Sequence, residues 1–168
     1  MAAGIAKSDV LSALQQALRT RLQRAQAAVA EAFDAATHEQ SRAENKYDTR
    51  ALEQSYLSAG QTARVEALRR QLTALHHYVL PDAPLDQVGP GALVEVVLSD
   101  AKGEQQRTLL ILPFDVAETV EVGEVGEVGS TMVHVVAAAA PLAKALRGRE
   151  AEDEVRFGSR VAYVASVR

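Results

Sequence analysis

Three carboxylates in one polar segment, residues 37–48, are the side chains in this sequence best suited to chemistry. Glu39, Glu44 and Asp48 lie there among almost no apolar residues. Carboxylate oxygens are the ligands that hard divalent cations prefer. The same residue types also solvate exposed bends and cap helices, so Asp48 has a second interpretation as a helix cap, and Glu39 and Glu44 as solvated charges. The polar segment is therefore either a solvated bend or the carboxylate-bearing end of a larger element.

Two long helical patterns flank the polar segment. The first has no Gly or Pro between Ile5 and Ser41 and repeats apolar residues at steps of three and four, which indicates one helix with a continuous apolar stripe. This stripe consists of Leu11, Leu14, Leu18, Leu22, Ala25, Val29, Ala32 and Ala36. The second helix is expected to open near Asn45 or Asp48 and to end before Pro81. Its stripe consists of Val65, Leu68, Leu72, Leu75 and Val79.

Two helices of similar length joined by a short polar bend favour an antiparallel coiled coil. Neither stripe can stay exposed in a monomer, so each helix needs the other. We therefore predict a coiled-coil hairpin over residues 1–80, with the polar segment at its far end. Gly60 interrupts the second helix, at a cost of about 1 kcal/mol relative to Ala.

The pattern changes after a stretch rich in Pro and Gly, residues 81–91, which we interpret as a linker. Beyond it, short apolar runs separated by turn residues predict a small sheet over residues 92–168. The expected strands cover residues 92–98, 106–112, 119–122, 132–136, 155–157 and 160–167. Pro141 and Gly148 bracket one short helix. The predicted fold class is α+β, a helical hairpin followed by an antiparallel sheet domain with one short helix.

Composition excludes several classes of function. The net charge of −4 argues against a general nucleic-acid or DNA binder, because neutralising phosphates needs a basic face. The chain has no cysteine, which excludes disulfides and thiolate metal sites. We see no signal peptide and no apolar run long enough for a membrane span, so we expect a cytoplasmic protein without a membrane partner.

The run of residues 139–155 resembles a signature of the bacterial Gre transcript-cleavage factors. The matching positions are Pro141, Leu142, Ala143, Ala145, Leu146, Gly148, Arg149 (for Lys), Asp153, Glu154 and Val155. Glu152 stands where the family usually has Gly. The N-terminal half is similar too, because Glu44, Asn45 and Tyr47, followed by residues 53–56, resemble the sequence after that family's hairpin tip. The resemblance therefore covers nearly the whole chain.

This resemblance implies an FKBP-like sheet domain without isomerase activity and a hairpin that enters the secondary channel of RNA polymerase. In the family, tip carboxylates help to hold a Mg²⁺ ion in the polymerase active centre. The polymerase then cleaves backtracked RNA near its 3′ end. Carried over to this chain, Glu44, then Glu39 and Asp48, would be the carboxylates acting there, with Glu44 and Glu39 as metal ligands. The expected partner-binding residues are Ser41, Asn45, Tyr47, Pro141 and Leu142. The chain would have no cofactor and no catalytic centre of its own.

Ser41 is the main departure from the family pattern, which has Asp at that position. A serine hydroxyl is a poor Mg²⁺ ligand beside a carboxylate. Two functions follow: a factor that assists cleavage, with Glu39 or Asp48 substituting for the missing Asp, or a regulator that occupies the channel without cleavage. A third alternative is an FKBP-like isomerase or interaction module. An isomerase needs an apolar pocket lined by aromatic side chains, and the sheet domain offers only Phe114, Phe157 and Tyr163.

Overall fold

The computed structural model describes residues 5–40, 49–81, 85–123 and 130–168, with the backbone alone for residues 35–40 and 49–58. The chain divides into two compact units. The sheet unit comprises Met1–Gln15 with His77–Arg168, and the hairpin unit comprises Gln16–His76. Helix α1 (Lys7–Gln40) therefore contributes its first turns to the sheet unit and the rest to the hairpin unit.

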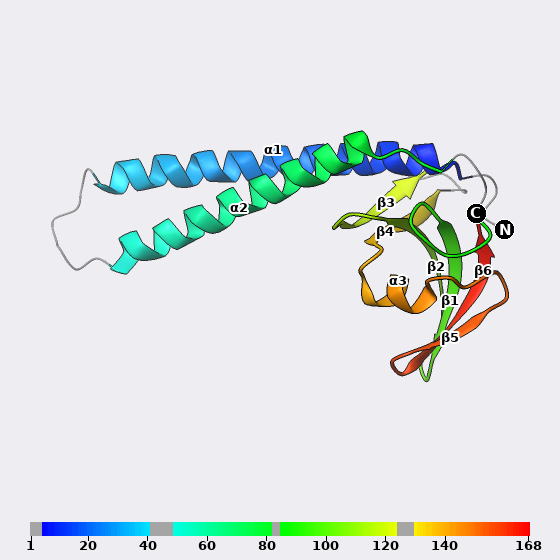
Figure 1. Cartoon of the computed structure of the whole chain (residues 1–168). Coiled ribbons are helices and arrows are strands. Elements are labelled where there is room, and N and C mark those ends of the chain that lie inside the picture. The colour runs from blue at the N-terminus through cyan, green and yellow to red at the C-terminus, as the bar shows by residue number, and fades with distance from the viewer. Residues whose placement is uncertain (1–4, 41–48, 82–84, 124–129) are drawn as a thin grey trace. The chain divides into compact units, whose positions relative to one another are not determined.

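The hairpin unit consists of α1 and α2 (Thr49–His77), which run antiparallel (Figure 1). At 1.5 Å per residue, the 34 residues of α1 span about 50 Å. Both helices confirm the predicted elements, and Leu18, Val65, Leu68 and Leu75 of the predicted stripes are buried in this unit. Among the described residues, no helix has both the length and the apolar content that a membrane crossing requires.

Val79 does not belong to the buried stripe, contrary to the prediction. Its side chain is 80% exposed, because α2 ends at His77 and the chain leaves the helical register before Pro81. Near the start of α1, Val10 is fully buried, although the predicted stripe of this helix does not include it. Val10 and the stripe residue Leu14 are the fully buried side chains that α1 contributes to the sheet unit.

Within the described residues, six strands form one sheet in the order β3-β4-β2-β1-β6-β5 (Figure 1). The strands are β1 (Leu93–Asp100), β2 (Gly103–Leu112), β3 (Ala117–Val122), β4 (Thr131–Ala137), β5 (Glu154–Phe157) and β6 (Arg160–Val167). Helix α3 (Pro141–Leu146) lies between β4 and β5 in the chain. The fold class is α+β, as predicted.

The sheet is mixed, which corrects the prediction of an antiparallel sheet. Strands β2 and β4 pair in parallel, with Leu110 opposite Val135, whereas the other neighbouring strands pair antiparallel. The reason is the route of the chain. After β2 it passes to the outer position, forms β3 at the edge, and returns as β4 between β3 and β2. The returning strand therefore has the same direction as β2.

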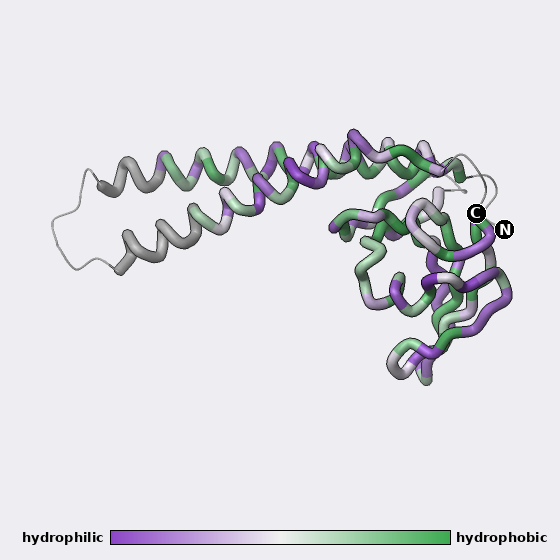
Figure 2. The backbone as a smooth tube through the Cα atoms, viewed as in Figure 1, coloured by the Kyte–Doolittle hydropathy of each residue, from purple (hydrophilic) through white to green (hydrophobic). Residues whose placement is uncertain are grey.

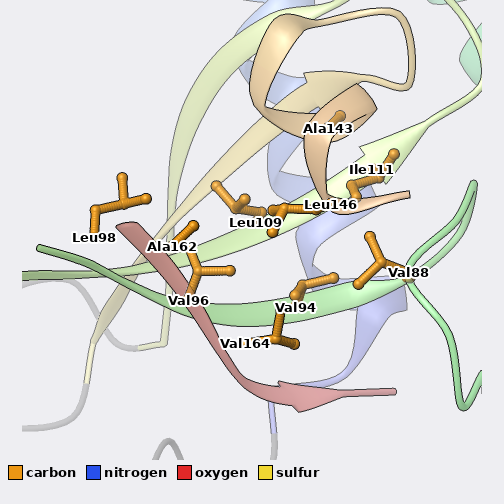
Figure 3. Close-up of a cluster of buried hydrophobic side chains, with 11 residues drawn as sticks. Val88, Val94, Val96, Leu98, Leu109, Ile111, Ala143, Leu146, Ala162 and Val164 are labelled. Carbon is orange, nitrogen blue, oxygen red and sulfur yellow. The ribbon is translucent and has the colours of Figure 1, made fainter. Parts of the chain in front are cut away.

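One face of the sheet packs against α3 and forms the main core of the unit. Figure 3 shows Ala143 and Leu146 of α3 directed toward side chains of β1, β2 and β6. The fully or nearly fully buried members of this cluster are Val88, Ala92, Val94, Val96, Leu98, Leu109, Ile111, Ala143, Leu146, Ala162 and Val164. Hydropathy follows the same division, since apolar residues concentrate on these strands and alternate with polar ones along the described parts of α1 and α2 (Figure 2). Burial of this apolar area is the main force that holds the sheet unit together.

The residues before β1 are fixed to the sheet unit by backbone hydrogen bonds. The N–H of Val88 donates to the carbonyl of Arg149 at 2.8 Å, and the N–H of Gly148 donates to the carbonyl of Val88 at 2.8 Å. The N–H of Gly91 donates to the carbonyl of Ile111 at 2.7 Å. The side chain of Val88 is also buried in the core. Residues 88–91 are therefore an ordered part of the unit's hydrogen-bond network.

Candidate functional site

The structure describes the helices that hold the polar segment, but not the segment's own side chains. Ser41, Glu44, Asn45, Tyr47 and Asp48 lie outside the described residues, and Glu39 is described only as backbone in the last turn of α1. Because α1 ends at Gln40 and α2 begins at Thr49, chain connectivity attaches residues 41–48 to the end of the hairpin unit that is remote from Gln16 and His76.

The described part of the chain offers no alternative metal site. Among those residues, no group of three or more His, Asp or Glu side chains is arranged to hold a metal ion. His134 and the adjacent pair His76 and His77 belong to no such group. The side chains of Glu44 and Glu39 lie outside that described part, so their role as metal ligands stays a prediction.

Charge is distributed unevenly along the hairpin unit. Arginines gather in the half that is remote from the polar segment, where Arg19, Arg21, Arg24, Arg64, Arg69 and Arg70 stand on the two helices. Because α1 and α2 run antiparallel, residues 19–24 and 64–70 lie at about the same level along the hairpin. The exposed acids Glu31 and Asp34 lie closer to the polar segment. The described hairpin thus has a basic band followed by an acidic one.

The residues that carry the sequence resemblance in the sheet unit divide into exposed and packed positions. Pro141 is exposed and opens α3, where its missing N–H would have had no helical partner anyway. Leu142 is half-buried and packs against the core cluster. Ala143 and Leu146 are buried. Of the two partner-binding residues predicted here, Pro141 is accessible to a partner, and Leu142 is partly used by the core.

The acidic end of the same signature forms a turn. The N–H of Asp153 donates to the carbonyl of Glu150 at 3.3 Å, and the Asp153 carboxylate accepts a hydrogen bond from the N–H of Glu150 at 3.0 Å. Glu152, inside this turn, has a positive φ of 73°, and its N–H donates to the carbonyl of Val164 at 2.8 Å. A left-handed conformation is easiest for glycine. This explains in physical terms why the position is usually Gly in the family that the signature resembles.

Replacing Glu152 by glycine is expected to stabilise the protein by roughly 0.5–1 kcal/mol. The left-handed conformation costs an L-residue about 1–2 kcal/mol, and the larger backbone entropy of glycine in the unfolded chain offsets part of the gain. Denaturant unfolding of Glu152→Gly against the parent chain measures the difference. Ala151→Gly is the matched control, because Glu152 is the one non-glycine residue with positive φ in the described part of the chain. Equal effects of the two substitutions would contradict the explanation.

A second polar contact in the sheet unit was not foreseen from the sequence. Oγ1 of Thr119 on β3 and Nδ1 of His134 on β4 form a hydrogen bond of 2.9 Å between directly paired residues. Burial is the larger cause that lowers the pKa of His134 from its usual 6.5, and the positive charge of Arg107 is the second. Only the strand register, which links positions 119 and 134, could have revealed this pair.

The lowered pKa of His134 predicts that stability falls as pH falls. Well above pH 6.5 the imidazole is neutral in both the folded and the unfolded state and has no effect on stability. As pH drops below 6.5, the unfolded chain binds the proton first, so the free energy of unfolding decreases until the folded pKa is passed. His134→Gln keeps a partner for Thr119 and removes the titration. The difference in Tm between this variant and the parent chain should therefore change across this pH window and be constant above it.

Comparison with solved structures finds similarity to a transcription factor. The chain is similar to the transcription factor Gfh1, with 20% identity over 93% of this chain and 94% of that chain and a TM-score of 0.38. GreA factor homolog 1 (Gfh1) of Thermus thermophilus is 21% identical over 92% and 94%, with a TM-score of 0.35. Thermus aquaticus Gfh1 is 18% identical over 91% and 92%, with a TM-score of 0.35. No protein-family model matches the chain, and no curated protein matches it.

Proposed function

We propose that this chain is a Gre-like factor that binds RNA polymerase through the secondary channel and assists cleavage of backtracked RNA. One observation carries the proposal. The polar segment with Glu44 joins the ends of two antiparallel helices of 34 and 29 residues, so its side chains are attached to the end of a long helical hairpin. Such a hairpin can carry carboxylates to a site inside another molecule. The chain would be an accessory factor, and the polymerase would perform the hydrolysis.

The carboxylates would act on a Mg²⁺ ion that belongs to the polymerase. Glu44 is the first candidate, followed by Glu39 and Asp48. When bound in that active centre, Mg²⁺ activates water and stabilises the leaving oxygen. The contribution of this chain is negative charge and oxygen ligands at a position that the hairpin sets, since Mg²⁺ binds with one or two carboxylates while it keeps several waters.

Other features of the chain support binding to the transcription complex. The arginines of the hairpin unit could contact RNA phosphates near the 3′ end, since cationic side chains supply the sequence-independent part of such binding. The exposed Pro141 could contribute to docking of the sheet unit on polymerase. Ser41, Asn45 and Tyr47 are the corresponding proposals within the polar segment.

Glu44→Ala tests the assignment of the carboxylate. With purified polymerase stalled on backtracked complexes, the parent chain should accelerate release of short RNA 3′ fragments. The variant should lose this effect by on the order of 100-fold, because charge stabilisation at a metal is worth several kcal/mol and each 1.36 kcal/mol is tenfold. Glu31→Ala, an exposed acid on α1, is the control and should retain the activity. Unchanged cleavage by Glu44→Ala would reject the role of Glu44.

The presence of Ser41 favours a second candidate, a channel-binding regulator that does not assist cleavage. In that case the parent chain would bind polymerase and alter initiation or pausing, without accelerating cleavage. Ser41→Asp supplies the carboxylate that the family pattern has at this position. Cleavage that appears only in Ser41→Asp would identify the parent chain as the non-cleaving regulator. Absence of binding by the parent chain would overturn both candidates.

A further inference from the structure

We propose that Gly60 and Gln61 form a hinge in α2, and that the distal half of the hairpin opens at this hinge while the proximal half stays closed. The distal half comprises residues 25–40 of α1 and 49–61 of α2. The proximal half comprises residues 16–24 and 62–76. The inference concerns the hairpin unit alone and goes beyond the proposed function.

Burial differs between the two halves. Among the hairpin side chains that the structure describes, which exclude residues 35–40 and 49–58, the buried apolar ones are Leu18, Val65, Leu68 and Leu75, and all four lie in the proximal half. In the distal half, the stripe residues whose side chains are described, Ala25, Val29 and Ala32, are only half-buried. Two of these three are alanines, which bury little apolar area even when covered. Regions with few buried apolar contacts open at low free energy, independently of the rest of the structure.

Gly60 weakens α2 at the boundary of the two halves. It lies in the interior of a continuous helix, where glycine is the least favourable residue apart from proline. A Cβ atom built at Gly60 would meet nothing within 4 Å, so packing does not require a glycine there. The backbone freedom of glycine lowers the cost of bending or unwinding the helix at this point.

Gln61 adds a second local defect next to Gly60. Its Oε1 atom is buried and has no hydrogen-bond partner within the described part of the chain. A buried acceptor without a donor destabilises the closed state, and opening lets water satisfy it. In Figure 1 the two helices separate toward Gln40 and Thr49, which agrees with weak pairing beyond this point. Described apolar side chains that are only half-buried, a glycine and an unsatisfied amide oxygen thus lie close together along the hairpin.

Opening would act on the polar segment, because residues 41–48 join the ends of both distal helices. The separation between the end of α1 at Gln40 and the start of α2 at Thr49 would change with each opening. The hinge would therefore change the distance that residues 41–48 must span.

Hydrogen exchange measured on the free full-length protein tests the hinge without polymerase, so the result does not depend on the proposed function. In the parent chain, distal amides of α1 and α2 should exchange at least about tenfold faster than proximal amides. Gly60→Ala should slow distal exchange about fivefold, since about 1 kcal/mol of helix propensity corresponds to that factor. Adding Gln61→Leu should slow it about a further tenfold, through removal of the unsatisfied oxygen.

Ala63→Gly is the matched control on the other side of the hinge, at an exposed position of the same helix. It should accelerate proximal exchange about fivefold and leave distal exchange unchanged, because the distal half opens without unfolding residue 63. Equal exchange of the two halves in the parent chain would overturn the proposal. Equal acceleration of both halves by Ala63→Gly would also overturn it, because it would mean that the hairpin opens as one cooperative unit.

Discussion

Leu146→Ala is expected to destabilise the sheet unit by about 3 kcal/mol. The side chain is fully buried between α3 and the sheet, in the cluster that includes Val94, Leu109 and Val164 (Figure 3). Truncation of a buried Leu removes its transfer free energy and leaves a cavity, with a typical loss of 2–5 kcal/mol in total. Denaturant unfolding, monitored by the circular dichroism signal of the strands, measures the loss. Thermal unfolding monitored by calorimetry is a second measurement.

Two positions on the same helix serve as controls for Leu146→Ala. Leu142 is half-buried against the same cluster, so Leu142→Ala should cost less. Lys144 is exposed, and Lys144→Ala should change stability by no more than about 0.5 kcal/mol. If Lys144→Ala and Leu146→Ala lowered stability equally, α3 would not be packed in the way described. The graded series would show that much of the signature resemblance reflects core packing and not partner contact.

Periodic apolar residues made the helices and the strands predictable. The stripe containing Leu14 and Leu18 marked α1, and alternating residues from Leu93 to Leu98 marked β1. Boundaries were less accurate where polar residues continue a ladder. Strand β2, for example, begins at Gly103, because Glu104 and Gln105 still pair with Ser99 and Leu98 of β1. Local pattern does not contain that information.

Strand order and direction were not predictable from local pattern in the same way. Residues of parallel and antiparallel strands alternate alike, so nothing between residues 113 and 130 marks β4 as the parallel neighbour of β2. One available signal was the unbroken apolar run of residues 109–112. These residues are all buried, as expected for a strand that is covered on both faces and flanked by strands on both sides.

For the candidate site, the sequence supports a prediction of residue type but none of geometry. Carboxylates at positions 39, 44 and 48 suggest metal chemistry by their type alone, while the absence of apolar periodicity around them means that no register can be assigned to their side chains. Glu152 shows the opposite case. Its departure from the glycine of the resembled signature coincides with the positive φ found there. The mismatch itself did not predict a conformation, and the positive φ became known from the structure.

Gly91→Ala is expected to destabilise the sheet unit by about 3 kcal/mol, through a combination of backbone strain and overpacking. Gly91 has a φ of 87°, and a Cβ atom there would lie 2.6 Å from Cδ of Pro81 and 2.9 Å from the hydroxyl oxygen of Tyr78. Tyr78 cannot easily move aside, because its ring packs edge-on against Phe114 with a centroid distance of 5.9 Å.

Gly89→Ala is the control for Gly91→Ala, since a Cβ at Gly89 meets nothing within 4 Å. A thermal unfolding comparison should show a clear fall in Tm for Gly91→Ala alone. Equal Tm values for the two variants would mean that the approach of residues 78–81 to Gly91 is not fixed in solution.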